Sequence, residues 1–384
     1  MENVYIVAAA RTPIGGFNGA LAMSSAPKLG AAAIKEALNR SGLKPEDIAE
    51  VIMGNVISCG IGQAPARQAA IYSGLPPSVG ALTVNKVCGS GLKAVTLGYQ
   101  MIRAGDAKAM VSGGMENMSQ APYLLEKART GYRFGHGQLI DANIKDGLWD
   151  PYDNIHMGNC AEACAEKHEV TREAQDEFAI SSYKKAQEAQ AKGSFKDEIV
   201  PVDGINEDEE PKKSNFDKFP KLKPVFKANG TVTPANASKL NDGGAAVVLA
   251  SESMVKERNL KPLAKILGWA QHSQEPIWFT TAPAGALQNL SKKTGMGLDE
   301  FDLFEINEAF AVVSLACMKL LNLPQEKINV NGGAVALGHP IGASGTRILV
   351  TLINALKQRN LKRGAAAICL GGGEAVSVGI EILN

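Results

Sequence analysis

Apolar residues in this chain form short uninterrupted runs that alternate with stripes at helical spacing. Residues 4–10 are almost entirely apolar, which predicts a buried strand, and residues 28–41 show helical spacing that stops before Gly42. The next predicted elements are a strand, a helix and a second strand, at residues 51–57, 92–102 and 107–112. Alternation of strands and helices predicts an α/β fold.

The second half of the chain repeats landmarks of the first half in the same order. Three pairs of segments correspond, each separated by about 250 residues: 47–55 with 300–307, 89–91 with 343–345, and 112–116 with 370–374. One such match is weak, because apolar segments often resemble one another. Three matches in order indicate an internal duplication.

The stretch between these halves, residues 119–244, has a different composition. It holds scattered glycines, a long helical pattern at residues 171–190 and a charged run at residues 207–213. We interpret the charged run as a solvated loop. The whole stretch is then an inserted, partly exposed subdomain.

The overall composition is typical of a globular protein. Of 384 residues, 45% are hydrophobic and 21% are charged, which is enough for two or more packed units. A net charge of +1 argues against nucleic acid or an anionic membrane as the main partner. The chain has six cysteines without a close Cys-x-x-Cys pair, no basic leader and no apolar run of membrane length. We therefore expect free thiols and a cytoplasmic location.

One cysteine stands in a turn that could make it reactive. Cys88 precedes an apparent helix start, and Gly89 and Gly91 leave room for a ligand beside the backbone N–H groups. A thiol at such a position is expected to have a lowered pKa. The competing interpretation is a small buried cysteine beside a tight turn.

Three further residues occupy positions suited to chemistry. His339 lies in the glycine-rich segment 331–345, which we expect to be a loop that holds the imidazole as a base or hydrogen-bond donor. Cys369 ends the apolar strand 365–368 before three glycines, a usual ligand position in α/β sheets. Asn307 follows another apolar strand and could hold a water. Alone, these would be a solvent-exposed loop histidine, a core cysteine and a helix cap.

Other common sites are not favoured by the sequence. No Gly-x-Gly-x-x-Gly follows the first predicted strand and no Gly-Lys-Ser/Thr occurs, so a dinucleotide or P-loop site is a weak hypothesis. His156, Cys160 and Cys164 share one helical face but have no further paired ligands nearby. We expect no metal site.

Taken together, these segments resemble the thiolase family along essentially the whole chain. The segments that carry the resemblance are 85–94, 307–310, 338–345 and 369–373, with 6–13 and 236–243 in addition. Within the family, residues 88–93 and 156–158 are similar to the biosynthetic, acetoacetyl-CoA-forming type.

The resemblance implies a fold of two duplicated βαβαβαββ halves in a five-layered αβαβα core. It implies that residues 1–118 and 245–268 form the N-terminal half and that residues 269–384 form the C-terminal half. Residues 119–244 would be a loop domain that contributes to coenzyme A binding and to contacts between subunits. Family members of this type are usually homotetramers, built as dimers of dimers.

The resemblance also implies roles for individual residues in a two-step Claisen condensation. Cys88 would carry an acetyl group from acetyl-CoA, and His339 would draw off the proton of its thiol. Cys369 would take the α-proton of a second acetyl-CoA. His339 and a water held by Asn307 would form one oxyanion hole, and the backbone N–H groups of Cys88 and Gly371 would form the other.

For substrate binding, the resemblance places His156, Met157 and Ser238 at the pantetheine tunnel. In the family, basic residues of the loop domain usually bind the CoA phosphates. The matching stretch of this chain departs from the usual arginine-containing pattern, and Lys212 or Lys213 would take over this role. Acetyl-CoA and coenzyme A would be substrates, with no permanently bound cofactor.

Three alternatives remain open on the sequence. A degradative 3-ketoacyl-CoA thiolase would accept longer chains. A ketoacyl synthase relative is disfavoured, because such enzymes use a second histidine where this chain has Cys369. A non-catalytic acyl-CoA or lipid carrier of the same fold would need no nucleophile, so the presence of Cys88 and His339 argues against it.

Overall fold

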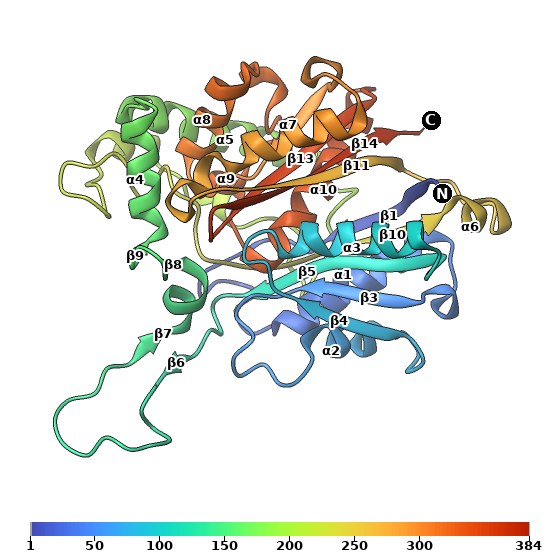
Figure 1. Cartoon of the computed structure of the whole chain (residues 1–384), viewed down its shortest axis with the longest axis horizontal. Coiled ribbons are helices and arrows are strands. Elements are labelled where there is room, and N and C mark those ends of the chain that lie inside the picture. Colours follow the sequence, from blue (N-terminus) through green and yellow to red (C-terminus); the bar gives the residue numbers. More distant parts are fainter. Residues whose placement is uncertain (1, 384) are drawn as a thin grey trace.

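The structure, a computed structural model, describes residues 2–383 (Figure 1). Its main elements form two sets that follow the same order, with eight elements in the first set and seven in the second. The first set is β1 (Val4–Arg11), α1 (Ala26–Ser41), β3 (Glu50–Gly54), α2 (Pro65–Tyr72), β4 (Gly80–Val84), α3 (Ser90–Ala104), β5 (Ala109–Asn117) and β10 (Asn241–Ser251). The second set is β11 (Ala264–Ser273), α7 (Ala282–Thr294), β12 (Leu303–Ile306), α8 (Ala311–Leu321), α10 (Ile341–Gln358), β13 (Arg363–Leu370) and β14 (Glu374–Ile382).

Further elements, which include two longer helices, connect or extend these two sets. They are β2 (Gly15–Gly16), β6 (Tyr123–Leu124), β7 (Ile140–Asp141), β8 (Trp149–Asp150), β9 (Ile155–His156), α4 (Met157–Lys167), α5 (Arg172–Ala191), α6 (Glu252–Glu257) and α9 (Ala334–Leu337). No helix within residues 2–383 is long and apolar enough to cross a membrane.

The strands of both halves form one extended sheet. Its order is β12-β13-β14-β11-β1-β10-β5-β3-β4, so the strands of each half stay together. The halves meet where β1 and β11 pair antiparallel at only two positions, Tyr5 with Lys265 and Ile6 with Ala264. The sequence pattern that indicated a duplication thus corresponds to two similar sheets joined at one short seam.

Helices cover the sheet in layers. α3 and α10 lie between the two halves, and their side chains, including Val95 and Leu349, share one core cluster with strands of both. A second cluster packs α1 and α2 on the outer face of the first half, and a third packs α7 and α8 on the outer face of the second. This arrangement is the predicted αβαβα order, and the α/β prediction is confirmed (Figure 1).

The central helices approach each other closely through glycine. A β-carbon on Gly91 of α3 would lie 2.9 Å from the backbone nitrogen of Thr346 in α10. A β-carbon on Gly345 of α10 would in turn collide with the backbone nitrogen of Leu92 in α3. The expectation that residues 331–345 form a loop is therefore wrong for residues 341–345, and it is also wrong for the short helix α9. The glycines there allow helix crossing, and α10 already begins at Ile341.

The predicted strand 107–112 also differs from the structure. β5 continues through Gly113 and Gly114 to Asn117, because β10 pairs with it along the whole length. A β-carbon at Gly113 would collide with the carbonyl oxygen of Ala245 on β10. The glycines therefore permit close strand contact here and do not end the strand.

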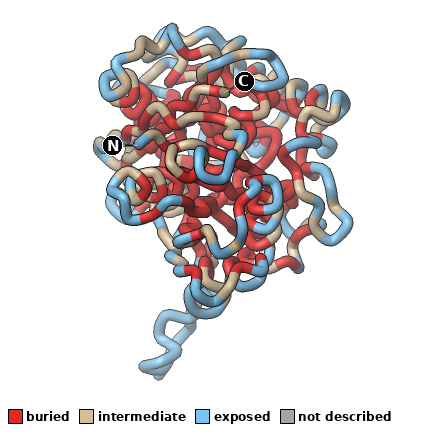
Figure 2. The backbone as a smooth tube through the Cα atoms, turned by 90° about the vertical axis from the view of Figure 1, so that its right-hand side faces the viewer, coloured by how far each residue is buried: buried red, intermediate tan, exposed pale blue. Residues whose placement is uncertain are grey.

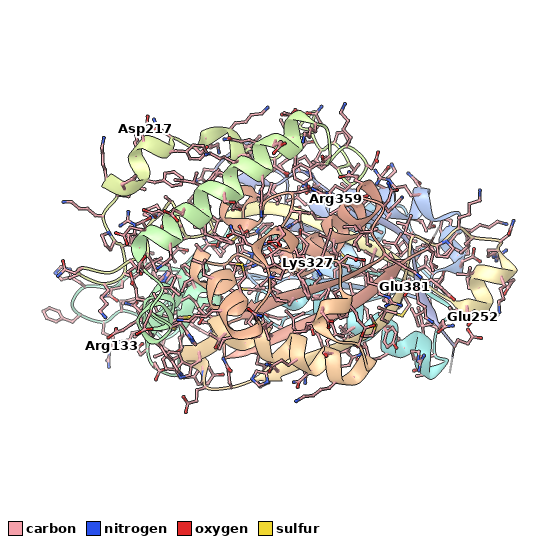
Figure 3. The ribbon with its side chains drawn as sticks, turned by 90° about the horizontal axis from the view of Figure 1, so that it is seen from above. Arg133, Asp217, Glu252, Lys327, Arg359 and Glu381 are labelled. Carbon is pink, nitrogen blue, oxygen red and sulfur yellow. The ribbon has the colours of Figure 1, made fainter. Side chains whose placement is uncertain are left out.

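The long connection between β5 and β10 corresponds to a short turn in the second half. In the second half, β13 and β14 are joined by residues 371–373 alone, whereas β5 and β10 are joined by residues 118–240. From this stretch an arm of residues 123–141 projects away from the body (Figures 1 and 2) and is mostly exposed. In Figure 3, Arg133 of this arm and Glu252 of α6 lie near opposite ends of the molecule. The exact division into halves and loop domain stays a prediction.

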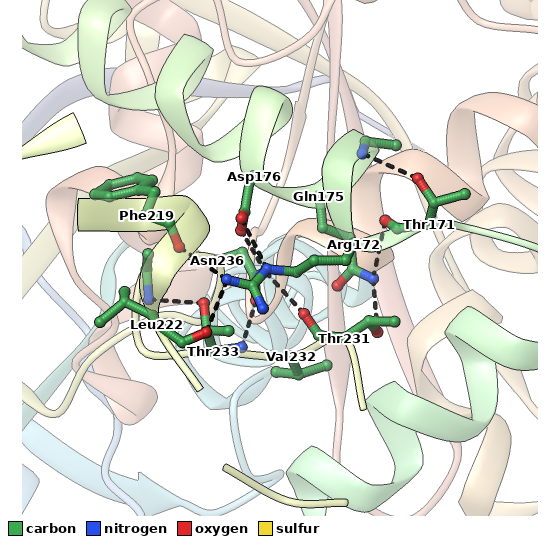
Figure 4. A network of polar contacts seen from close by, with 12 residues as sticks. Thr171, Arg172, Gln175, Asp176, Phe219, Leu222, Thr231, Val232, Thr233 and Asn236 are labelled. Atoms are coloured by element: carbon green, nitrogen blue, oxygen red, sulfur yellow. Dashed lines mark hydrogen bonds and ion pairs between the residues drawn. The ribbon is translucent and has the colours of Figure 1, made fainter. Parts of the chain in front are cut away.

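Polar contacts hold the inserted stretch together and to the core. Arg172 at the start of α5 donates to Asp176 at 2.7 Å and to the carbonyl oxygens of Phe219 and Leu222 (Figure 4). Arg11 of β1, fully buried, pairs with Glu198 at 2.6 Å and with Asp208 at 2.7 Å. Removing one partner would leave the other charge buried and unpaired, at a cost of about 3–5 kcal/mol. The interpretation of residues 207–213 as a solvated loop is therefore wrong for Asp208, which is buried against Arg11.

Candidate active site

A cavity of about 340 Å³ opens between the two halves and the inserted stretch. Most of its wall is apolar, and few polar side chains reach it, as expected of a ligand site. Its lining includes five of the residues singled out from the sequence, together with the backbone of one glycine: Cys88, His156, Met157, Ser238, His339 and Gly371.

Cys88 occupies a sharp turn directly before α3. Val87 has a φ of +45°, a conformation rare for a β-branched residue and found mostly at functional sites. The turn is held by Asn85, whose side-chain oxygen accepts from the backbone N–H of Val87 at 2.9 Å. Backbone N–H groups of Cys88 and Gly371 face the sulfur.

The pKa of Cys88 differs from the sequence-based expectation. Burial raises the pKa of this thiol to about 12, although the N–H groups of Cys88 and Gly371 act in the opposite direction. The predicted lowering at a helix start is therefore wrong, because loss of water around the sulfur outweighs the nearby backbone dipoles. The resting residue is a thiol, and its use as a nucleophile needs a base.

His339 is suited to be that base. Its side chain is buried, and burial together with the positive charge of Arg347 lowers its pKa to about 3, so the ring is neutral at physiological pH. Nδ1 lies 2.6 Å from the hydroxyl oxygen of Ser344, and this hydroxyl donates to the carbonyl oxygen of Pro340 at 2.9 Å. Because the single hydroxyl proton is used there, Ser344 accepts from Nδ1–H, which leaves Nε2 unprotonated.

Two asparagines contact His339, one at its backbone and one at its ring. The side-chain oxygen of Asn241 accepts from the backbone N–H of His339 at 2.8 Å, and its amide donates to the carbonyl of Gly15. The amide nitrogen of Asn307 lies 3.5 Å from Nε2 of the ring. The other side-chain atom of Asn307, its oxygen, is buried without a partner among the described residues, which fits the predicted role of holding a water.

Cys369 lies at the end of β13 and is fully buried. Burial raises its pKa well above the usual value for a thiol, and the nearby sulfur of Cys88 adds to this shift. Two residues further along the chain, Gly371 reaches the cavity wall. The structure thus places Cys88 and His339 in one cavity wall. Asn307 lies beside the imidazole and Cys369 lies near Cys88, but neither of them lines the cavity itself.

The predicted binding residues fall into two groups. His156 stacks on Phe226 with ring centroids 4.7 Å apart, and Met157 and Ser238 lie in the same cavity wall. Lys212 and Lys213 do not line the cavity. Lys212 pairs with Glu207, and the ammonium of Lys213 lies 3.1 Å from a carboxylate oxygen of Glu210.

One buried carboxylate near the site was missed by the sequence reasoning. Glu116 of β5 accepts from the backbone N–H groups of Val56, Ile57 and Gly342, at 3.0, 3.2 and 3.0 Å. Burial raises the pKa of Glu116 to about 7. It joins the start of α10 to a loop of the first half, and only its place in the duplicated pair 112–116 and 370–374 drew notice in the sequence.

Comparisons with known proteins agree with this geometry. The family model "Thiolase, N-terminal domain" matches residues 4–253, and "Thiolase, C-terminal domain" matches residues 260–382. A probable acetyl-CoA acetyltransferase of Dictyostelium discoideum is 53% identical over 392 residues, with 100% of this chain and 95% of that protein covered. The acetyl-CoA acetyltransferase of Schizosaccharomyces pombe is 53% identical over 388 residues, with 98% of each covered.

A solved structure is similar over the full length. The crystal structure of Acat5 thiolase from Ascaris suum in complex with coenzyme A superposes with a TM-score of 0.96 at 47% sequence identity, and 100% of both chains is covered.

Proposed function

Because this chain belongs to the thiolase family, we propose that it is an acetyl-CoA C-acetyltransferase. It condenses two molecules of acetyl-CoA to acetoacetyl-CoA and free coenzyme A, and it catalyses the reverse thiolysis. Relatives named acetyl-CoA acetyltransferase, which are 53% identical in sequence over almost their full lengths, support this choice within the family. Their names also favour an acetyltransferase over a degradative 3-ketoacyl-CoA thiolase.

The observation that carries the proposal is the pairing of a protonated thiol with a neutral imidazole in one cavity. Cys88 and His339 both line the cavity, and the free Nε2 of His339 is the proton acceptor that Cys88 requires. A carrier protein has no use for such an arrangement.

In the first half-reaction, Cys88 passes its proton to Nε2 of His339 and attacks the acetyl-CoA carbonyl. The developing oxyanion is stabilised by the N–H groups that face this sulfur, those of Cys88 and Gly371. The C–S bond to coenzyme A breaks, Cys369 protonates the leaving thiolate, and an acetyl-Cys88 thioester remains.

In the second half-reaction, the thiolate of Cys369 removes an α-proton from a second acetyl-CoA. Its raised pKa makes this thiolate a strong base. The enolate oxygen is stabilised by the protonated His339 and by a water on Asn307. The enolate carbon attacks acetyl-Cys88, and His339 returns its proton to the Cys88 sulfur that is released.

The substrates are coenzyme A thioesters, and no permanently bound cofactor takes part in these steps. His156, Met157 and Ser238 line the route to Cys88 and are proposed to contact the pantetheine arm. Lys212 and Lys213 remain our prediction for the CoA phosphates, and they would exchange their present carboxylate partners for phosphate.

We also propose a cytoplasmic homotetramer. The arm of residues 123–141 carries large exposed apolar side chains, among them Tyr123 and Phe134, which a contact with another subunit would cover. All six cysteines are free, as expected in a reducing compartment. A relative from Gibberella zeae is named as cytosolic.

The deciding experiment is an assay of the purified protein with 3-ketoacyl-CoAs of four to ten carbons and free coenzyme A. Acetoacetyl-CoA should be cleaved to acetyl-CoA far faster than the longer substrates, and acetyl-CoA alone should slowly form acetoacetyl-CoA. Comparable cleavage of the long substrates would transfer the assignment to a degradative thiolase. Binding of coenzyme A without any turnover would point to a carrier.

A further inference from the structure

Lys239 is a half-buried cation in the wall of the cavity, and the sequence reasoning and the proposed mechanism leave it without a role. Its ammonium donates to the carbonyl oxygen of Val335 at 2.6 Å and to that of Ala237 at 3.1 Å. The same nitrogen lies 4.9 Å from the ring centroid of Tyr183. Two carbonyl oxygens and one aromatic ring therefore surround the ammonium group, and these contacts fix its position.

The carbonyl that Lys239 holds belongs to the segment that carries His339. Val335 lies in α9, a helix of four residues that ends directly before Gly338 and His339. So short a helix closes only three backbone hydrogen bonds of its own, from the N–H groups of residues 336–338 to the carbonyl oxygens of Gly333 and Ala334, and a single turn is marginal in isolation. Its position depends on contacts from outside, and the bond from Lys239 to Val335 is one of them.

A second contact to the same segment comes from two residues further along the chain. Asn241 accepts from the backbone N–H of His339 at 2.8 Å. Lys239 and Asn241 thus hold the segment 335–339 at both ends, one through a carbonyl and the other through an N–H. Lys239 and the intervening Leu240 also line the cavity, so this part of the chain forms part of the substrate wall.

Charged groups around Lys239 keep its ammonium in place. Glu308, whose carboxylate accepts from the backbone N–H of Val335 at 3.1 Å, and Glu210 are the acidic groups that act on it, while Tyr183 of α5 offers its ring. Burial lowers the pKa of Lys239 to about 8, and the two carboxylates act against this shift. The residue is therefore mostly charged at neutral pH and loses that charge above pH 8.

We propose that Lys239 is a positioning residue for His339, which holds the α9 segment so that Nε2 of the imidazole meets the thiol of Cys88. This inference rests on the proposed function, because it concerns the acetylation of Cys88. Lys239 touches neither reacting atom. It acts through Val335, and its loss misplaces the base without removing it.

The test compares Lys239→Met and Lys239→Arg with the matched control Lys185→Met. Lys185 is also a partly buried lysine with a lowered pKa, and it donates to the backbone carbonyl of Ile328 at 3.0 Å, but it does not line the cavity. The readouts are the rate of Cys88 acetylation by acetyl-CoA, followed by mass spectrometry in a rapid-quench series, the KM for acetyl-CoA, and thermal unfolding.

We expect Lys239→Met to acetylate Cys88 about 10- to 100-fold more slowly, with a much smaller change in KM, since misplacement by about 1 Å has effects of this size. Lys239→Arg should recover part of the rate and should keep it between pH 8 and pH 9.5, where the native rate declines. Lys185→Met should lose thermal stability but keep the acetylation rate.

Each other outcome is decisive. A folded Lys239→Met protein with the native acetylation rate overturns the inference, as does an equal loss of rate in Lys185→Met. If the native protein itself shows no acetylation of Cys88, the proposed function fails rather than the role of Lys239. Lys239→Met could also fail to fold, and Lys239→Gln is then measured in its place. A native acetylation rate and a native pH profile in Lys239→Gln would overturn the role of Lys239.

Discussion

Nδ1 of His339 lies 2.6 Å from the hydroxyl oxygen of Ser344, which stands five residues further along the chain in the first turns of α10. The hydroxyl proton of Ser344 is directed to the carbonyl of Pro340. This contact sets the tautomer of the imidazole and leaves Nε2 free to accept a proton. Ser344, which takes no part in the proposed reaction steps, thus determines which ring nitrogen of His339 acts as the base.

Substitution Ser344→Ala should therefore slow thiolysis. Without an acceptor at Nδ1, part of the population carries its proton on Nε2, and we expect kcat for acetoacetyl-CoA to fall about 10-fold or more. Ser314→Ala is the control, because Ser314 is also buried in a helix and its hydroxyl has no hydrogen-bond partner among the described residues. A native kcat in Ser344→Ala would contradict the assignment of the tautomer.

The two thiols should separate into different steps. Cys88→Ser should abolish the acetyl-enzyme, whereas Cys369→Ala should still be acetylated on Cys88 but should lose condensation. Intact-protein mass after incubation with acetyl-CoA, followed by peptide mapping, measures both. Acetylation of Cys88→Ser at native stoichiometry would reject Cys88 as the acyl carrier, and full condensation activity in Cys369→Ala would reject Cys369 as the base.

The crossing of α3 and α10 predicts a loss of stability on a small substitution. In Gly345→Ala the new methyl group meets the backbone of Leu92, which cannot move without shifting α3. We expect the free energy of unfolding to fall by about 1–3 kcal/mol in urea titrations. In Gly80→Ala the nearest atom is the flexible Glu50 side chain at 3.4 Å, so that variant should stay within about 0.5 kcal/mol of the native protein. Equal stability of both variants would disprove the tight crossing.

The lowered pKa of His339 predicts a loss of stability in acid. The folded state keeps this ring neutral down to about pH 3, whereas the unfolded chain takes up a proton below its ordinary value of 6.5. The contribution of this residue is thus complete above pH 6.5 and declines as the pH falls, by about 2 kcal/mol at pH 5. Unfolding of native protein and His339→Asn at pH 7 and pH 5 measures the difference. An identical pH dependence in both proteins would show that His339 does not titrate in this way.

Local patterns in the sequence predicted many elements well. The apolar run at residues 303–306 coincides with β12, and the helical pattern at residues 28–41 ends at Ser41, where α1 also ends before a left-handed Gly42. These elements depend on periodicity and on a stop signal, which are both local. The predicted strand 107–112 stops before Gly113, and the predicted loop 331–345 includes Gly345, yet these glycines lie inside β5 and α10. Their function is set by neighbours that are distant in the chain.

The sequence by itself determined the α/β class and the duplication, and it singled out Cys88, His339 and Cys369 as candidate site residues, because periodicity and glycine-flanked motifs are visible along the chain. Only the tertiary structure decided the protonation of these residues. Burial between the two halves raises the pKa of the Cys88 thiol and lowers that of His339, reversing the expected direction for the cysteine. The tertiary structure also revealed the contacts of Ser344 with His339 and of Lys239 with Val335. Desolvation and hydrogen-bond partners arise from segments far apart in sequence, so no local pattern contains them.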